Sequence, residues 1–140
     1  MTTNDLAAGY HRKCCDRIAA HEVLHARRAF SDVVWESQEV VELALKGMLR
    51  WAGIDPPKIH DVGDLLLRFA GRFPDVSIAE LELLAEASKA LRKEREFSFY
   101  GDIDFIPTDE YDTEDADTAF GQARQATACL GRLLGGKGDE

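Results

Sequence analysis

The chain has 140 residues, the size of one compact domain. It carries 17 Lys and Arg against 26 Asp and Glu, so its formal net charge is −9. Sequence-independent nucleic-acid binding takes most of its affinity from a basic surface, so this balance excludes a protein that coats DNA or RNA, although it leaves room for a small basic site. No apolar run reaches the roughly 18 residues of a membrane span, and the N-terminus lacks the apolar segment of a signal peptide. We therefore expect a cytoplasmic protein with no membrane association and no DNA ligand.

Apolar residues recur with helical periodicity along most of the chain. The pattern predicts a first helix from about Asp5 to Ala29 and a second from Ser31 or Asp32 to Ala52. Gly53 is suited to end the second helix, and the Pro56-Pro57 pair prevents it from continuing.

Further helices are predicted in the second half of the chain. A short one should follow Asp61 and end before Pro74, and the next starts at a capping box formed by Ser77 and Glu80 and reaches about Phe97. After an acidic loop (residues 101–112), the last helix should be capped by Asp112 or Thr113 and run to Leu134. The sequence thus predicts an all-α fold. We expect an antiparallel up-and-down bundle of four to five helices in one domain, with a core at about 10–134 and a flexible tail at 135–140.

The three cysteines are an odd number, and two of them are neighbours in the sequence. A disulfide framework is therefore not expected, and a reducing compartment is favoured. Adjacent residues on a helix point about 100° apart, so Cys14, Cys15 and the nearby His11 could not all hold one metal ion. We expect the two neighbouring cysteines to be small buried thiols.

Residues 21–25 (HEVLH) match the HExxH zinc-hydrolase pattern, in which two histidines on one helix face bind the metal and Glu22 polarises a water. No His follows His60, so a carboxylate would have to be the third ligand. The acidic loop also departs from an EF-hand, because Ile106 stands where an oxygen ligand is needed. A zinc hydrolase is kept only as a remote alternative. We expect His21 and His25 to be an exposed pair, with no metal and no cofactor.

Glu42 and Lys46 have the i, i+4 spacing of a helical ion pair, and they lie among apolar residues that should partly cover them. A separate basic patch ends in the aromatic run Phe97-Ser98-Phe99-Tyr100. Arginine beside aromatic rings suits contacts with phosphates and bases. The patch consists of Lys89, Arg92, Lys93 and Arg95.

Three groups of residues, taken together in their order and spacing, carry a family resemblance. They are residues 37–46 (SQEVVELALK), residues 53–62 (GIDPPKIHDV) followed by Leu65-Leu66, and Arg95 with Phe99-Tyr100-Gly101, Tyr111 and Asp115-Ala116. Over about residues 10–134 the chain resembles the HEPN domain (higher eukaryote and prokaryote nucleotide-binding). The family's fold is an up-and-down bundle of four to five helices, in agreement with the helices read from periodicity.

The resemblance implies one of two functions. Some members of the family are metal-independent endoribonucleases, often toxins, with the motif Arg, four to six residues, His. Others lack the motif and act as binding or scaffold proteins, frequently beside a small nucleotidyltransferase. Here Arg95 matches the motif arginine, but Tyr100 stands where the His would be, and Asp102 occupies the place of a tyrosine that accepts AMP in some toxins.

The leading hypothesis is a HEPN module that binds a nucleotide or a partner protein and does not cleave RNA. Arg95 would contact phosphate and Tyr100 would stack or donate a hydrogen bond, with Glu42 and Lys46 lining the same region and His60 holding the connection after the second helix. A homodimer, a nucleotidyltransferase partner of a toxin–antitoxin type and a nucleotide or RNA ligand are expected. The alternative is an endoribonuclease toxin that uses Arg95 and Tyr100 across a dimer interface.

Overall fold

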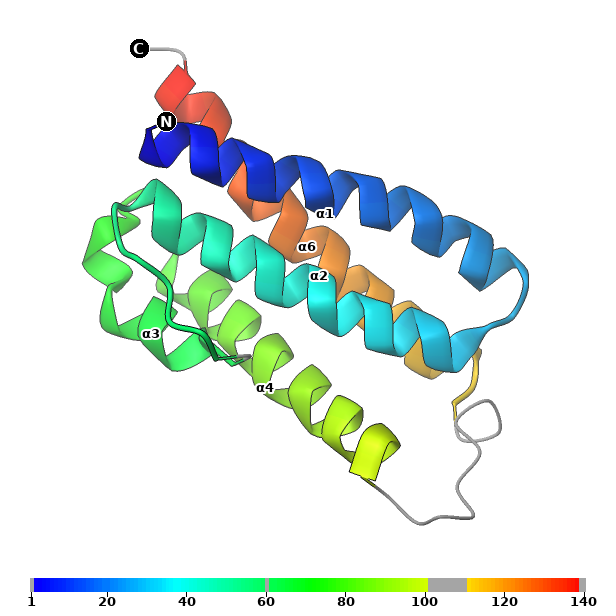
Figure 1. Cartoon of the computed structure of the whole chain (residues 1–140). Coiled ribbons are helices and arrows are strands. Elements are labelled where there is room, and N and C mark those ends of the chain that lie inside the picture. The colour runs from blue at the N-terminus through cyan, green and yellow to red at the C-terminus, as the bar shows by residue number, and fades with distance from the viewer. Residues whose placement is uncertain (1, 60, 101–110, 139–140) are drawn as a thin grey trace.

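The computed structural model describes residues 2–59, 61–100 and 111–138, with the backbone alone for residues 3, 91–100 and 137–138. The described residues contain helices and no strand: α1 (Thr3–Ala26), α2 (Phe30–Trp51), α3 (Gly63–Arg68), the 3-10 helix η1 (Ala70–Arg72), α4 (Ile78–Tyr100) and α6 (Thr113–Gly138). The long helices α1, α2, α4 and α6 alternate in direction, and the short α3 packs beside α4 (Figure 1). The predicted all-α bundle is confirmed.

The first helix begins earlier than the sequence pattern indicates because Thr2 caps it. The Thr2 hydroxyl accepts a hydrogen bond from the Asp5 backbone N–H (3.1 Å), and the Asp5 carboxylate accepts one from the Thr2 N–H (3.0 Å). This reciprocal pair satisfies two backbone donors that a helix start leaves without partners. Asp5 therefore lies inside the first turn, and the helix ends at Ala26 instead of Ala29.

Both α1 and α2 end in the same left-handed turn. After α2, the Ile54 N–H donates to the Leu49 carbonyl (2.8 Å), and Gly53 has a φ of +82°. After α1, the Ala29 N–H donates to the Leu24 carbonyl (2.9 Å), but the residue with positive φ is Arg28, at +61°. Gly53 thus ends the second helix as predicted. A side chain in this conformation costs about 1 kcal/mol relative to glycine, so Arg28 occupies a place that glycine would fill more easily.

The segment between α2 and α4 is fixed by Asp61. Its carboxylate accepts hydrogen bonds from the Gly63 N–H (3.1 Å), at the start of α3, and from the Ser88 hydroxyl (2.9 Å), on α4. The Ser77 hydroxyl accepts a bond from the Glu80 N–H (3.1 Å) at the start of α4, as half of the predicted capping box. The Glu80 carboxylate pairs with Arg132 on α6.

The last helix starts at a second reciprocal cap. Asp112 and Asp115 each accept a hydrogen bond from the other's backbone N–H, at 2.9 and 3.1 Å, which confirms Asp112 as a cap. The helix continues to Gly138, beyond the expected end at Leu134. Most of the predicted acidic loop, residues 101–110, lies outside the described residues.

The core is built around α2, which packs against α1, α4 and α6. The buried face of α2 is wide because apolar or small residues occupy more than half of its circumference. Phe73, Leu81, Leu84 and Leu130 contribute large side chains from the surrounding elements. Among the described residues, no helix is both long enough and apolar enough to cross a membrane.

Gly63 lets α3 lie directly on α4, and we predict that Gly63→Ala destabilises the protein. A Cβ atom at this position would lie 2.9 Å from the Ala85 Cα atom and 3.0 Å from its carbonyl oxygen, and backbone atoms cannot move aside as a side chain can. The expected loss is about 1–3 kcal/mol in the free energy of unfolding, measured by urea denaturation.

Gly121→Ala is the matched control, because Gly121 is an exposed residue within α6 and a Cβ there meets no atom within 4 Å. It should stabilise the protein by about 0.5–1 kcal/mol through its higher helix propensity. A loss of stability in both variants, or in neither, would contradict this account of the contact between α3 and α4.

Candidate functional site

The structure brings together one pair of the site residues predicted from the sequence. The Lys46 ammonium group lies 3.2 Å from a Glu42 carboxylate oxygen, one turn apart on α2. Their side chains are 15% and 17% exposed, which confirms that neighbouring residues partly cover the pair. An ion pair at this depth is shielded from solvent more than a surface pair, so removing one partner leaves the other charge poorly compensated.

The other predicted site residues are less fully described. Arg95 and Tyr100 lie in the last two turns of α4, where the structure describes the backbone alone. His60 lies outside the described residues. The grouping of all five residues into one site therefore stays a prediction.

A small cavity of about 240 Å³ lies where α2, α4 and the first turns of α6 meet. Its apolar lining includes Val34 and Ala90, and Ala90 directly precedes the described backbone segment that carries Arg95. The residues of the lining with polar side chains are Tyr111, Glu114, Asp115, Thr118 and Gln122. Small-molecule sites usually enclose roughly 300–1,000 Å³, so this cavity has room for one ring or side chain and not for a whole nucleotide.

The polar groups of this cavity suit a hydrogen-bond donor. The carboxylates of Glu114 and Asp115 repel phosphate and accept bonds from an amino group, such as the exocyclic amine of a base. A phosphate attached to such a base would need a cation outside the cavity.

The histidines of the HExxH pattern do not form the exposed pair that the sequence suggests. His21 is 1% exposed, because its ring packs 5.7 Å from the ring of Phe120 on α6. His25 is about one-third exposed, and its Nε2 atom lies 2.5 Å from a carboxylate oxygen of Asp117. Within the described part of the chain, no three His, Cys, Asp or Glu side chains are grouped as a metal site would need.

Burial and, to a smaller extent, the nearby positive charge of Arg17 lower the pKa of His21 to about 4, against the opposing effect of Glu39. Both ring nitrogens lack a hydrogen-bond partner among the described residues. His21 is therefore neutral at physiological pH and acts as a core residue.

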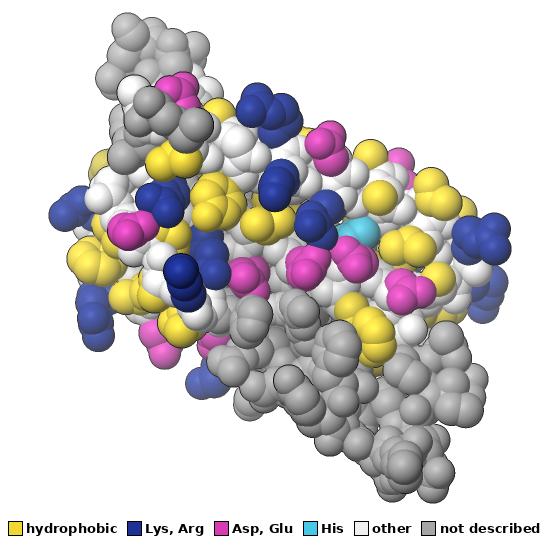
Figure 2. Space-filling model, in the orientation of Figure 1, with side chains coloured by type: hydrophobic (Ala, Val, Ile, Leu, Met, Phe, Trp, Pro, Cys, Tyr) yellow, Lys and Arg dark blue, Asp and Glu magenta, His cyan; other side chains and the backbone are white. Residues whose placement is uncertain are grey.

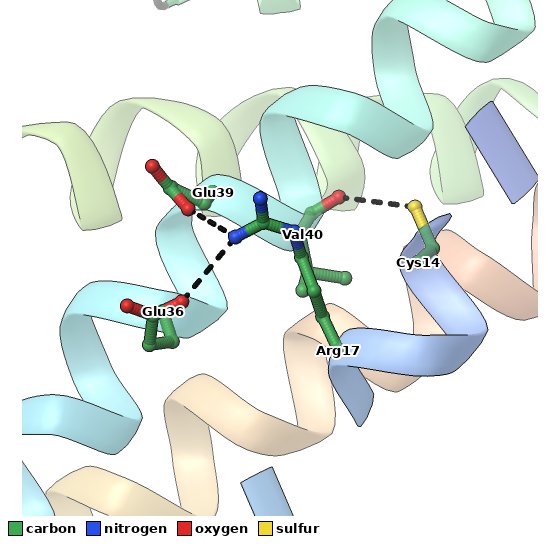
Figure 3. Close-up of polar contacts among 5 residues, drawn as sticks. All are labelled: Cys14, Arg17, Glu36, Glu39 and Val40. Carbon is green, nitrogen blue, oxygen red and sulfur yellow. Dashed lines mark hydrogen bonds and ion pairs between the residues drawn. The ribbon is translucent and has the colours of Figure 1, made fainter. Parts of the chain in front are cut away.

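The neighbouring cysteines also differ from expectation in one respect. Cys14 is buried against α2, where its thiol lies 3.7 Å from the Val40 carbonyl oxygen, and burial raises its pKa to about 12 (Figure 3). Cys15 is exposed, 3.7 Å from a ring nitrogen of His11. The prediction of two buried thiols is therefore wrong for Cys15, because successive residues of a helix face different directions.

One polar cluster was not predicted from the sequence. Arg17 on α1 points toward α2 and pairs with Glu36 (3.4 Å) and with Glu39 (Figure 3). Figure 2 shows a row of Asp and Glu side chains along the middle of the face of the molecule that it draws. Arg17 lies 19 positions before Glu36 and 22 positions before Glu39, so no local spacing in the sequence could reveal the cluster.

We predict that the free energy of unfolding falls by about 3 kcal/mol as the pH drops from 6.5 to 4 because of His21 alone. Its folded pKa of about 4 lies below the value of 6.5 in the unfolded chain, so protons bind the unfolded state first. This stability is fully present above pH 6.5 and is lost as the pH falls toward 4.

His21→Leu should remove this dependence and be at least as stable at pH 7, since it replaces a buried group that lacks hydrogen bonds. Urea denaturation of both proteins at a series of pH values gives the difference directly, because the other titrating groups are common to both. Parallel curves for the two proteins would show that His21 is not the source.

A comparison with protein-family models matches residues 11–133 to the HEPN domain. Two further comparisons, one with curated proteins and one with solved structures, find no match. The matched segment covers nearly all of the bundle, from the first half of α1 to the last turns of α6. The chain belongs to the HEPN domain family.

Proposed function

We propose that this chain is a HEPN module that binds a nucleotide or a partner protein and does not cleave RNA. The observation that carries the proposal is a feature of the sequence: no Arg in the chain is followed by a His after four to six residues, and the last His is His60. Membership of the HEPN family is compatible with nucleotide binding and with a ribonuclease-like activity. The absence of the motif histidine favours nucleotide binding.

The imidazole matters because RNA cleavage through the 2′-hydroxyl needs an acid or base that titrates near pH 7. Histidine provides one, whereas an unperturbed tyrosine has a pKa near 10. Tyr100, which occupies the place of the His, cannot replace it in that role. A guanidinium needs no titration to hold phosphate, so Arg95 keeps its binding role without the histidine.

The proposed site combines Arg95 and Tyr100 with the small cavity beside Ala90. The guanidinium binds phosphate in a bidentate manner, and the acidic lining of the cavity accepts bonds from the base. Stacking on an aromatic ring adds about 1–3 kcal/mol for a base. Together these contacts support an affinity in the micromolar range. In this proposal Glu42 and Lys46 would line the same central region of the bundle, and His60 would hold the connection between α2 and α3.

The partner is proposed to be a small nucleotidyltransferase, as in motif-lacking relatives of a toxin–antitoxin type. Such a partner would itself bring nucleotide to the complex. The expectation of a nucleotide ligand and the expectation of a protein partner are thus compatible.

We predict that Arg95→Lys weakens nucleotide binding about tenfold. Lysine keeps the charge but loses the planar fork, and one bidentate contact is worth roughly 1.4 kcal/mol in this setting. Isothermal titration of the purified protein with ATP and AMP measures the effect. Lys13→Ala removes a charge from an exposed position on α1, outside the proposed site, and should leave the affinity within about twofold.

Unchanged affinity in Arg95→Lys, together with a lower melting temperature, would assign Arg95 a structural role and overturn the proposed site. Incubation with total RNA tests the alternative function. Cleavage by the wild-type protein that disappears in Arg95→Ala would show that the chain is an endoribonuclease.

We predict that the protein is a homodimer. The exposed face of the monomer includes large apolar side chains, among them Ile78 and Leu83 on α4, which are 55% and 53% exposed. Self-association would remove such surface from water. Light scattering at micromolar concentration should report twice the chain mass of 15.6 kDa, and a value equal to the chain mass would refute the dimer.

A further inference from the structure

Two arginines and three rings form a continuous row at the end of the bundle where α1 turns into α2. The Arg28 guanidinium lies 5.1 Å from the centre of the Phe30 ring, and the ring of His25 lies 6.1 Å from Phe30. His25 is in turn 6.3 Å from Phe120, and the Arg124 guanidinium lies 4.5 Å from the centre of Phe120. The row joins α1, α2 and α6, and cations stand at both of its ends.

The backbone at Arg28 indicates that its side chain has a use other than ending the helix. The equivalent residue after α2 is Gly53, which adopts the left-handed conformation without strain. Arg28 adopts it with a full side chain. Strain of this kind persists where the surrounding structure holds it in place, and it is frequent at binding sites.

Two arginines at this turn form no ion pair within the part of the chain that the structure describes. Arg124 pairs with Glu22 (3.1 Å), and His25 pairs with Asp117. Arg27 and Arg28 are exposed and form no ion pair with any described residue. Figure 2 shows Lys and Arg side chains at the right-hand end of the molecule, where Figure 1 places this turn.

The remaining groups near the turn only partly oppose this positive charge. Asp32, in the first turn of α2, is a carboxylate near the turn that forms no ion pair with a described residue. No described side chain caps the N-terminus of α2, and the positive end of the helix dipole lies at the same turn. The turn is therefore a local basic surface on an acidic protein.

We propose that Arg27 and Arg28 bind the phosphate group of a nucleotide or oligonucleotide, with the paired Arg28 and Phe30 side chains as a support for the adjoining base. The Arg28 guanidinium carbon lies over the Phe30 ring, and the N–H donors of this exposed side chain can contact a phosphate in bidentate fashion. Guanidinium groups and aromatic rings are both suited to stacking on a base. The proposed surface uses other residues than Arg95 and Tyr100, and its ligand rests on the proposed nucleotide-binding function.

Arg28→Gly tests the proposal because binding and stability should respond differently. Glycine relieves the left-handed strain, so the melting temperature should stay equal or rise despite the lost contact with Phe30. The affinity for a fluorescein-labelled ten-residue oligoadenylate RNA, measured by anisotropy at low salt, should fall about five- to tenfold. Arg12→Gln removes the same charge from an exposed site in the first half of α1, away from the turn, and should change the affinity less than about twofold.

The double variant Arg27→Gln, Arg28→Gly gives a second readout. Each lost phosphate contact on a single strand reduces the magnitude of the slope of log affinity against log salt concentration by about 0.7, so loss of the phosphate that the two arginines share should reduce it by about 0.7. AMP as a second probe separates the two sources of phosphate. A loss of AMP binding identifies a single phosphate as the ligand, and a loss confined to the RNA identifies the phosphodiester chain.

Unchanged RNA and AMP affinity in the Arg28 variants would overturn the proposal and leave only a role in ending α1. If affinity depends on Arg95 and not on Arg28, this inference fails and the proposed function stands. If it depends on Arg28 and not on Arg95, the inference holds and the Arg95 site fails. If the wild-type protein binds neither probe, both proposals fail.

Discussion

The packing of α2 against three other helices is the constraint on which the rest of the structure depends. Its close approach to α1 and α6 requires Gly47, where a Cβ atom would lie 2.7 Å from a Leu130 methyl group and 3.0 Å from the Tyr10 Cβ atom. A larger residue would push both neighbours outward. The small cavity and the row of arginines and rings both depend on this packing, because each is formed by α2 together with its neighbours.

The charges of the protein are arranged locally although the whole chain is strongly acidic. Carboxylates of α2 pair with Arg17 and Lys46, and carboxylates of α1 and α6 pair with Arg124 and His25. Arg27 and Arg28 at the α1–α2 turn form no ion pair with a described residue, so the proposed phosphate contact there is compatible with a net charge of −9. Screening at physiological salt limits the influence of the distant carboxylates to about 8 Å. Net charge excludes a nucleic-acid-coating protein but does not exclude a small phosphate site.

The proposed chemistry follows from what an arginine can do without a histidine. A guanidinium binds phosphate at every accessible pH, but it does not move protons near pH 7. On this ground we propose that a HEPN bundle with Arg95, and with Tyr100 in place of the imidazole, holds a nucleotide and does not cleave RNA. The acidic lining of the small cavity beside α6 is compatible with this proposal, since it can accept hydrogen bonds from a base while the phosphate is bound outside the cavity.

The sequence by itself determined the features that depend on neighbours along the chain. The helical periods, the glycine stop at Gly53, the Asp112 cap and the partly covered Glu42–Lys46 pair all arise within a few residues, so they could be predicted. The fragments that resemble the HEPN domain were likewise readable in order and spacing, and the family comparison confirmed them.

Only the tertiary structure decided which side of each helix is covered. The first helix has no clear apolar face, so the burial of His21 against Phe120 and the exposure of Cys15 depended on where α2 and α6 lie. The contacts of Arg17 with Glu36 and Glu39 join residues of different helices. Arg28 could not be predicted as a helix end, because the residue with positive φ after a helix is usually glycine. The contacts of the folded chain hold this arginine in the left-handed conformation beside Phe30.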